Sequence, residues 1–257
     1  MRFYDLDIDV KNYAKRIVDA GYKCPADINS VSDFVKGLKL LNIWGDVIFW
    51  PLRANQNAGT GTKAYSLGKI GIYDGTLVGS PTWGANGVWT TPTSYIEINN
   101  AFINTFILIS VYRKTTNSTN GAICSSYAAP NPPAEIGYEL RHDASNSPQA
   151  RFYSSSSNNA RTTSVNCNDG KYHFLAGITD NISAMVFADG TAGSFTSVAG
   201  TRSIPTNNFT IGRRGPTNSE SVPIESSFVC IFGNYSNSIS SFYSLYKSTL
   251  GKGLNLP

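Results

Sequence analysis

A series of short apolar segments between residues 70 and 236 constrains the fold more than any other feature of the chain. The segments recur about every ten residues, with glycine, proline, asparagine and serine between them, which is typical of an antiparallel sandwich or barrel. No long helical pattern interrupts the series, as a parallel α/β fold would require. Strands are predicted at residues 70–73, 77–78, 95–98, 106–113, 122–126, 137–142, 150–154, 161–165, 173–179, 184–188, 209–212 and 227–233.

The composition of these segments also indicates which strand faces are buried. Apolar and polar residues alternate at 95–98 and at 138–142, which predicts strands with one buried face. The continuous apolar run at 106–112 predicts a strand that is buried on both faces. Asp189 and Gly190 predict a hairpin turn, because tight hairpin turns need residues that tolerate a positive φ angle.

Apolar residues at helical spacing predict two helices near the start of the chain and one near its end. The first helix ends at Gly21, and the second begins at Ser30 with Asp33 as its capping partner. The two apolar stripes consist of Val10, Tyr13, Ala14, Ile17 and Val18, and of Val31, Phe34, Val35, Leu38 and Leu41. This helical hairpin needs an apolar partner, which is either the sandwich of the same chain or a neighbouring subunit. A short terminal helix is predicted over residues 239–249.

Composition and charge disfavour several classes of protein. Charged residues make up 15% of the chain and the net charge is +4, without any basic block. Arg213 and Arg214 are interpreted as solvated loop arginines, so no nucleic-acid partner is expected. No apolar run is long enough to cross a membrane, and no secretory signal is recognisable, which predicts a protein made in a cytoplasm. The cysteines lack the spacing of zinc sites and are predicted to be buried thiols; they are Cys24, Cys124, Cys167 and Cys230.

Three groups of segments, taken in order, resemble the laminin-G-like and concanavalin-like jelly-roll superfamily. They are residues 75–83 with 87–89 and 95–98, residues 169–178 with 185–190, and residues 209–214 with 227–233. They are similar to the opening strands, the central hairpin and the closing strands of that superfamily. The resemblance implies an all-β, concanavalin/laminin-G-like jelly-roll β-sandwich over residues 47–257, preceded by a helical segment at 1–46 that serves in docking or assembly.

The segment before the sandwich resembles the layout of tailed-bacteriophage virion proteins. Two short helices lead into an aromatic stretch with Trp44 and Trp50, and then into a loop rich in glycine and asparagine at 55–68. The resemblance implies a fibre, tail appendage or capsid decoration component located in the virion. It would assemble with itself as a homo-oligomer and with other virion proteins. The expected interface consists of the helical hairpin, the two tryptophans and a flexible arm formed by residues 55–68.

The sequence offers little that would support catalysis. Only two histidines, His142 and His173, are present, and no Gly-x-Ser-x-Gly motif accompanies them. The closely spaced carboxylates that glycoside hydrolysis uses are also missing, because Gly137 interrupts the spacing between Glu135 and Glu139. We therefore predict no enzymatic activity, no cofactor and no transition-metal site. Loop residues considered for a structural calcium ion are Asp143, Asp180 and Asp189.

Carbohydrate binding is the function that the jelly-roll resemblance implies. Arg141, Arg151 and Tyr153 are predicted to project from a sheet face opposite Leu140 and Phe152, and they are the candidate ligand-binding residues. An ordinary polar sheet face is the alternative interpretation. The leading functional hypothesis is a bacteriophage virion structural protein. The alternatives are a glycan-binding adhesin that contacts host-surface glycans and, third, a polysaccharide hydrolase.

Overall fold

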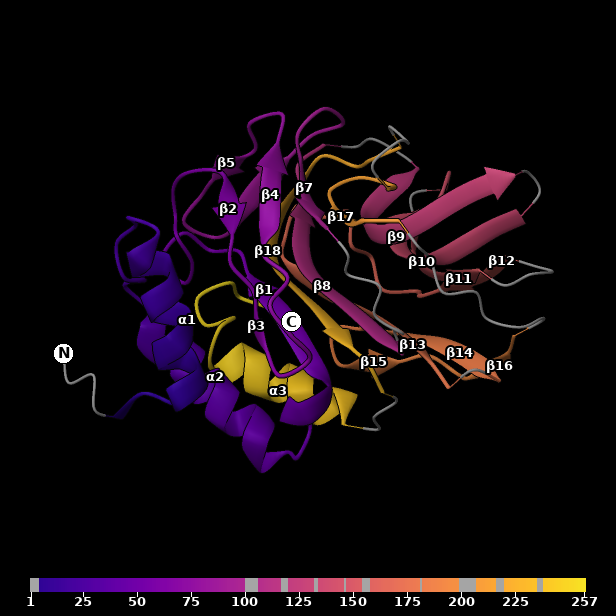
Figure 1. Cartoon of the computed structure of the whole chain (residues 1–257). Coiled ribbons are helices and arrows are strands. Elements are labelled where there is room, and N and C mark those ends of the chain that lie inside the picture. The colour runs from indigo at the N-terminus through magenta and orange to yellow at the C-terminus, as the bar shows by residue number, and fades with distance from the viewer. Residues whose placement is uncertain are drawn as a thin grey trace.

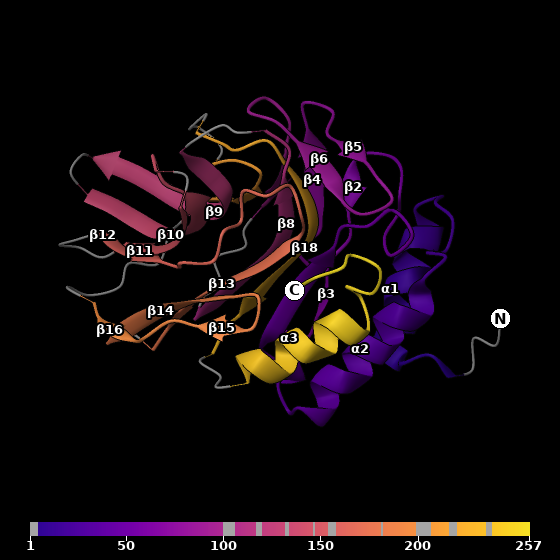
Figure 2. The same cartoon turned by 180° about the vertical axis from the view of Figure 1, so that it is seen from behind.

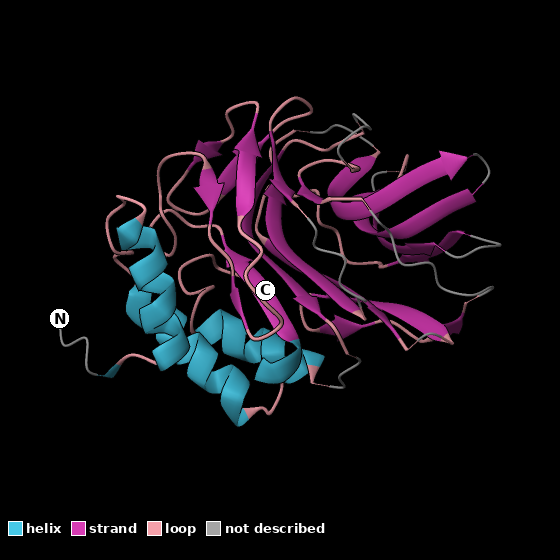
Figure 3. Ribbon diagram, viewed as in Figure 1, coloured by secondary structure: helices cyan, strands magenta, loops and turns pink. Residues whose placement is uncertain are grey.

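The chain forms a β-sandwich of two antiparallel sheets, with three helices on the outer side of one of them (Figure 1). This computed structural model describes residues 5–99, 106–116, 120–131, 134–145, 147–153, 158–180, 182–198, 207–215, 220–234 and 238–257. The arrangement confirms the predicted all-β jelly roll with an N-terminal helical hairpin and a short C-terminal helix. Figure 3 shows the helices gathered on one side of the strands.

The first sheet has ten strands in the order β15-β14-β13-β8-β18-β1-β3, with β16 beside β14, β6 beside β18 and β5 beside β6. Its strands are β1 (Val47–Pro51), β3 (Leu67–Gly68), β5 (Thr82–Trp83), β6 (Val88–Thr90), β8 (Ile107–Lys114), β13 (His173–Thr179), β14 (Ser183–Ala188), β15 (Thr191–Ala192), β16 (Thr196–Ser197) and β18 (Ile224–Phe232). Every residue of β1, β13 and β18 is buried. These strands are buried on both faces because helices cover one face and the second sheet covers the other.

The second sheet has eight strands in the order β12-β11-β10-β9-β17-β7-β4-β2. They are β2 (Lys63–Ala64), β4 (Gly75–Val78), β7 (Tyr95–Ile98), β9 (Gly121–Asn131), β10 (Ala134–His142), β11 (Pro148–Tyr153), β12 (Asn158–Thr162) and β17 (Phe209–Ile211). Its inner face contributes Leu140 and Phe152 to the core between the sheets, where Trp50 of the first sheet stacks on Phe209 with ring centroids 5.8 Å apart. Its outer face carries polar side chains.

A second apolar core fixes the helices to the ten-stranded sheet. Phe34 makes edge-on contacts with four rings, at centroid distances of 5.2 Å to Phe49, 5.7 Å to Phe228, 5.4 Å to Phe242 and 6.2 Å to Tyr246. The hairpin therefore docks onto the sandwich of its own chain, which decides between the two partners considered for it. Trp44 and Trp50 are also buried within the chain, so neither is available for the expected interface between copies.

The helices lie close to their predicted positions, with one shifted start. α1 spans Ile8–Asp19 and is capped by Asp7, whose carboxylate accepts a hydrogen bond from the backbone of Asp9. α2 spans Ile28–Leu40 and begins after Asp27, so the predicted start at Ser30 is wrong. α3 spans Ile239–Ser248. A single 3₁₀ turn, Trp44–Asp46, leads from α2 into β1. None of the helices described is long and apolar enough to cross a membrane.

The polar segment at residues 55–68 is not a free arm. Asn57 is 1% exposed, and its amide donates to the carbonyl oxygens of Pro51 and Tyr65 at 2.7 and 2.9 Å. Its carbonyl oxygen accepts hydrogen bonds from the backbone of Ala58 and Tyr65. Because a buried amide with four partners is held firmly, the predicted flexible arm is wrong, and this segment is part of the folded body.

Candidate ligand-binding site

A polar cluster lies on the outer face of the eight-stranded sheet, centred on adjacent positions of β10 and β11. Glu139 pairs across the strands with Arg151, and Gly137 pairs with Tyr153. Because side chains alternate along a strand, Arg141, Arg151 and Tyr153 share this face, while Leu140 and Phe152 face the core between the sheets. The structure thus brings together the three residues predicted from the sequence.

A buried carboxylate organises the cluster. Glu139 is 1% exposed, and its Oε1 accepts hydrogen bonds from Arg141 Nη1 at 2.9 Å and from the Tyr153 hydroxyl at 2.7 Å. Its Oε2 accepts from Arg214 Nε at 3.2 Å. Burial of a charge is costly unless the charge is paired and hydrogen-bonded, so these three donors make the position of Glu139 tenable.

Arg214 corrects an interpretation made from the sequence. It is 7% exposed and belongs to the cluster, so the interpretation of it as a solvated loop arginine is wrong. Its guanidinium carbon lies 3.8 Å from the ring centroid of Tyr127, and its Nη2 donates to the Tyr153 hydroxyl at 2.7 Å. A loop residue has no periodicity that would place it on a sheet face. The alternation of side chains along β10 predicts that Glu139 lies on the outer face. It cannot predict its partner Arg214, which lies 75 residues further along the chain.

Tyr153 has a structural position within the cluster. It is 1% exposed, and its ring packs edge-on against Tyr127 at a centroid distance of 5.3 Å. Burial, together with the nearby charge of Glu139, raises the pKa of the Tyr153 hydroxyl. The ring therefore has no open face on which a ligand could stack, although its hydroxyl helps to fix Glu139.

A polar pocket of about 420 Å³ opens beside the cluster. It is lined by Asn120, Arg141, Asp143, Ala144, Ser145, Gln149, Arg151, Arg214 and Glu220. Glu220 bridges two of the guanidinium groups, with its Oε2 at 3.2 Å from Arg141 Nη2 and 3.3 Å from Arg214 Nη1. Nearly all of the lining is therefore composed of hydrogen-bonding groups held in place by one another.

Arg151 is the pocket arginine held most loosely by its neighbours. Its Nε donates to Gln149 Oε1 at 3.0 Å, while its Nη1 lies 3.9 Å from Glu139 Oε1, beyond hydrogen-bond distance. Its side chain is 20% exposed, against 3% for that of Arg141. Arg151 is therefore the guanidinium best placed to turn towards a bound ligand.

The three aspartates considered for calcium are not gathered into one site. Asp143 accepts hydrogen bonds from the backbone of Ser147 and from the Gln149 amide, both at 2.8 Å. Asp180 accepts from the backbone of Ser183 at 2.6 Å. Within the described ranges, the one group of three or more potential metal ligands is Cys167, His173 and Asp189, which the sequence spacing did not indicate.

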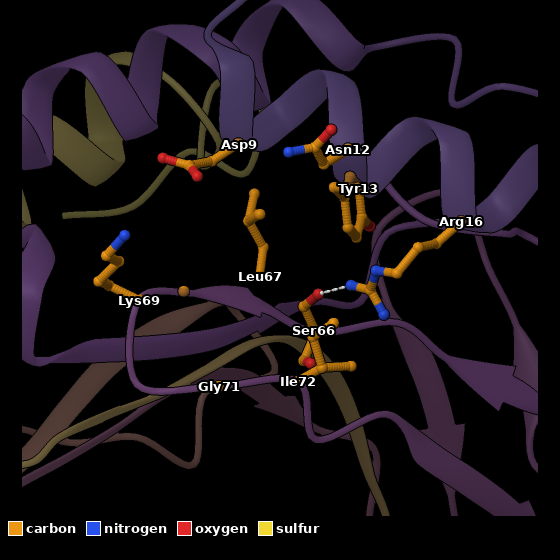
Figure 4. Close-up of a pocket in the computed structure, with 10 residues that line it drawn as sticks. Asp9, Asn12, Tyr13, Arg16, Ser66, Leu67, Lys69, Gly71 and Ile72 are labelled. Carbon is orange, nitrogen blue, oxygen red and sulfur yellow. Dashed lines mark hydrogen bonds between the residues drawn. The ribbon is translucent and has the colours of Figure 1, made fainter.

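A smaller pocket of about 240 Å³ lies between α1 and the connection from β3 to β4 (Figure 4). Two of its charged groups, Arg16 and Asp9, are engaged in pairs within the chain. Arg16 Nη1 lies 2.8 Å from Asp74 Oδ2 and Arg16 Nη2 donates to the carbonyl oxygen of Ser66, while Asp9 lies 2.7 Å from Lys39 Nζ. These contacts attach α1 to α2 and to the segments that flank β3, so we place the candidate site at the larger pocket.

No protein-family model and no curated protein sequence matches this chain. Similar solved structures include a Trypanosoma rangeli sialidase in complex with sialic acid, with a TM-score of 0.57 and 16% identity over 80% of this chain and 33% of the sialidase. They also include the binding domain of botulinum neurotoxin DC in complex with SialylT, with a TM-score of 0.57 and 13% identity over 76% of this chain and 50% of the other. The receptor-binding domain of botulinum neurotoxin type G has a TM-score of 0.51 and 13% identity, over 69% of this chain and 49% of the other.

This chain thus spans between a third and a half of the length of these proteins. At such low identity the likeness shows the fold alone, and the class that it defines is the jelly-roll β-sandwich. The structures named here include no virion protein.

Proposed function

We propose that this chain is a glycan-binding module whose saccharide site is the polar pocket beside Glu139. The observation that carries the proposal is a pocket of about 420 Å³ whose lining combines guanidinium, carboxylate and amide groups. Neighbouring hydroxyls of a sugar both donate and accept hydrogen bonds, and such planar groups engage them in pairs. Because the lining is already held by ion pairs and hydrogen bonds, less conformational entropy is lost when a ligand binds.

The structural likeness supports a glycan over other polar ligands. The sialidase structure is described with sialic acid and the neurotoxin binding domain with SialylT. In this chain, Arg151 would provide the main donor to the saccharide, and Glu220 and Asp143 would provide acceptors. Tyr153 and Arg141, which were predicted as direct contacts, would act through Glu139 and Arg151 by fixing the shape of the pocket.

The positions of the carboxylates favour binding of a saccharide without hydrolysis. A glycosidase needs a carboxylic acid that can give its proton to the leaving oxygen, together with a second carboxylate across the sugar bond. Glu139 and Glu220 both form ion pairs with Arg141 and Arg214, and Glu139 is 1% exposed and does not line the pocket. We therefore expect this module to hold a saccharide and release it unchanged.

Substitution of Arg151 tests the site. We expect the purified protein to bind one class of glycan on a dense array, and Arg151→Ala to weaken that binding about 10- to 100-fold, because charge-assisted hydrogen bonds contribute about 1.5–3 kcal/mol each. The matched control is Arg213→Ala, which removes a guanidinium that packs over Tyr95 outside the pocket lining. The proposal fails if no glycan binds at high multivalent density, or if both variants lose binding equally.

A place in a bacteriophage virion, with self-association and other virion proteins as partners, stays a prediction from the sequence. Most apolar side chains of the hairpin and both tryptophans that were to form the interface are buried inside the chain, although Val18 is 48% exposed. Light scattering at micromolar concentration separates the possibilities. A monomer is what a free-standing module predicts, whereas a defined homo-oligomer would support assembly through a surface other than the hairpin.

A further inference from the structure

A second polar cluster lies at the start of β13, among elements that do not line the proposed glycan pocket. Cys167 comes from the loop before β13, His173 is the first residue of that strand, and Asp189 follows β14. The sulfur, a ring nitrogen and a carboxylate oxygen of these residues all lie within 4.8 Å of one another. We propose that they bind a divalent transition-metal ion, with zinc as the best fit.

The hairpin of β13 and β14 explains why residues so far apart in sequence meet here. Asp189 and Gly190 have φ angles of 48° and 86°, which turn the chain back sharply after β14. The turn carries the Asp189 carboxylate over the start of β13, where its Oδ1 accepts a hydrogen bond from the backbone of Phe174 at 2.8 Å. The carboxylate whose other oxygen, Oδ2, would bind the ion is thus held in place by the fold itself.

The histidine has the surroundings that metal-binding histidines usually have. Its Nδ1 lies 2.6 Å from Asp189 Oδ2, and its Nε2 lies 2.8 Å from Asp169 Oδ1. A metal-bound histidine commonly donates its other ring N–H to a carboxylate, which fixes the orientation of the ring. Asp169 is in place for that role, so the ion would take the position of the proton between His173 and Asp189.

For His173 and Asp189 the geometry requires only a small adjustment, and the Cys167 sulfur lies within 4.8 Å of both ligand atoms. Around a tetrahedral zinc ion, ligand atoms at about 2.0–2.3 Å from the metal lie roughly 3.3–3.5 Å from one another. The His173 and Asp189 atoms would therefore separate by less than about 1 Å from their present hydrogen-bond distance. The Cys167 sulfur completes three protein ligands and leaves a fourth position for a water molecule or another small ligand.

The donor set selects the kind of metal. A thiolate, an imidazole and a carboxylate together suit zinc and related ions, whereas calcium and magnesium prefer oxygen ligands alone. The side chains of His173 and Asp189 are 3% and 4% exposed, and that of Asp169 is 30% exposed. An ion bound between His173 and Asp189 would therefore be largely enclosed by protein.

Cobalt titration of the full-length protein under reducing conditions tests the site directly. We expect one equivalent of Co²⁺ to give the near-ultraviolet charge-transfer band of a thiolate–cobalt bond, and Zn²⁺ to abolish that band by competition. Cys167→Ser should remove the band. Cys24→Ser, which alters a partly exposed thiol outside the cluster, should leave it unchanged. The proposal is overturned if the wild-type protein gives no such band, or if the band depends on Cys24 instead.

A second variant tests the site even if Cys167→Ser does not fold. Asp169→Asn leaves all three metal ligands in place, and we expect it to weaken Zn²⁺ affinity about 10- to 100-fold, as loss of an outer carboxylate typically does. Zn²⁺ should also raise the melting temperature of the wild-type protein and not that of Cys167→Ser. Equal Zn²⁺ affinity of Asp169→Asn and the wild type would contradict the assigned geometry. Glycan binding should be the same in all of these variants, so the two proposals fail independently.

Discussion

At the scale of single residues, Glu139 has the most demanding environment in the described structure. Its carboxylate is almost completely removed from water and depends on two arginines and a tyrosine for its hydrogen bonds. Those arginines are in turn held close together by this carboxylate and by that of Glu220, which bridges them. The site is therefore a single electrostatic unit, in which the loss of one member affects all the others.

Glu139→Gln should destabilise the protein strongly. The amide keeps the shape but not the charge, so Arg141 and Arg214 would repel one another with less compensation. We expect a loss of about 3–5 kcal/mol in the free energy of unfolding, measured by urea denaturation. Glu220→Gln is the matched control, since its carboxylate is 39% exposed and should cost less than about 1 kcal/mol. Equal losses would show that burial of Glu139 is not what makes it important.

Lys114 makes stability depend on pH. It is 5% exposed, and burial lowers its pKa to about 8. Because its pKa in the unfolded chain is higher, the unfolded state binds more protons between pH 8 and 10.5, and the cost of burying this charge falls as the pH rises through that window. Lys114→Met should therefore be more stable than the wild type at pH 7, by about 1–3 kcal/mol, with the advantage shrinking towards pH 10.5. A difference that does not vary with pH would refute this.

At the scale of elements, the aromatic side chain of Phe34 anchors α2 to the rest of the fold. Phe34 is fully buried among the rings of β1, β18 and α3. Phe34→Ala should cost about 3–5 kcal/mol by leaving a cavity, as measured by chemical denaturation. Val18→Ala on α1 is the control, because Val18 is 48% exposed and its truncation should change stability by less than about 0.5 kcal/mol. Comparable losses would mean that the helices are not anchored through this core.

The strands that could be predicted are those in which burial follows a simple period. The strand at 95–98 was predicted with its observed bounds because one face is core and the other is polar. The predicted strand at 70–73 is wrong because local side chains replace the ladder. There the Ser66 hydroxyl accepts a hydrogen bond from the backbone of Tyr73 at 2.8 Å, and the Asp74 carboxylate accepts one from the backbone of Ser66 at 2.9 Å. Such bonds compete with strand pairing and leave no trace in hydrophobic periodicity.

The candidate site, like the strands, was predictable only where burial follows a simple period along a strand. Alternation along β10 and β11 places Arg141, Arg151 and Tyr153 on one face, and the structure agrees. Their burial could not be predicted, because it depends on Arg214 and Glu220, which arrive from a distant loop. Likewise, the spacing of Cys167 and His173 matches no zinc motif, and Asp189 joins them only through the β13–β14 hairpin.

At the scale of the whole molecule, the helices complete the sandwich. The predicted boundary at residue 46 separates them from the strands, yet their apolar faces share one core with the ten-stranded sheet. A fragment of residues 47–257 would expose Phe49, Phe228 and other large side chains of that sheet. We expect it to aggregate on expression, while the full chain stays soluble under the same conditions. A soluble, cooperatively folding fragment would show that the boundary divides independent units.

The covering of only one sheet by helices gives the molecule a front and a back. The proposed pocket lies on the outer face of the eight-stranded sheet, whereas α1 and α3, which stand next to the two chain ends, pack against the opposite sheet (Figure 2). A tag at either chain end would therefore attach the protein through its helical side, away from the pocket. Copies immobilised in this way on a sensor surface would all present the pocket to the solution. The avidity measured with a multivalent ligand would then depend on the surface density of the protein and not on differences in its orientation.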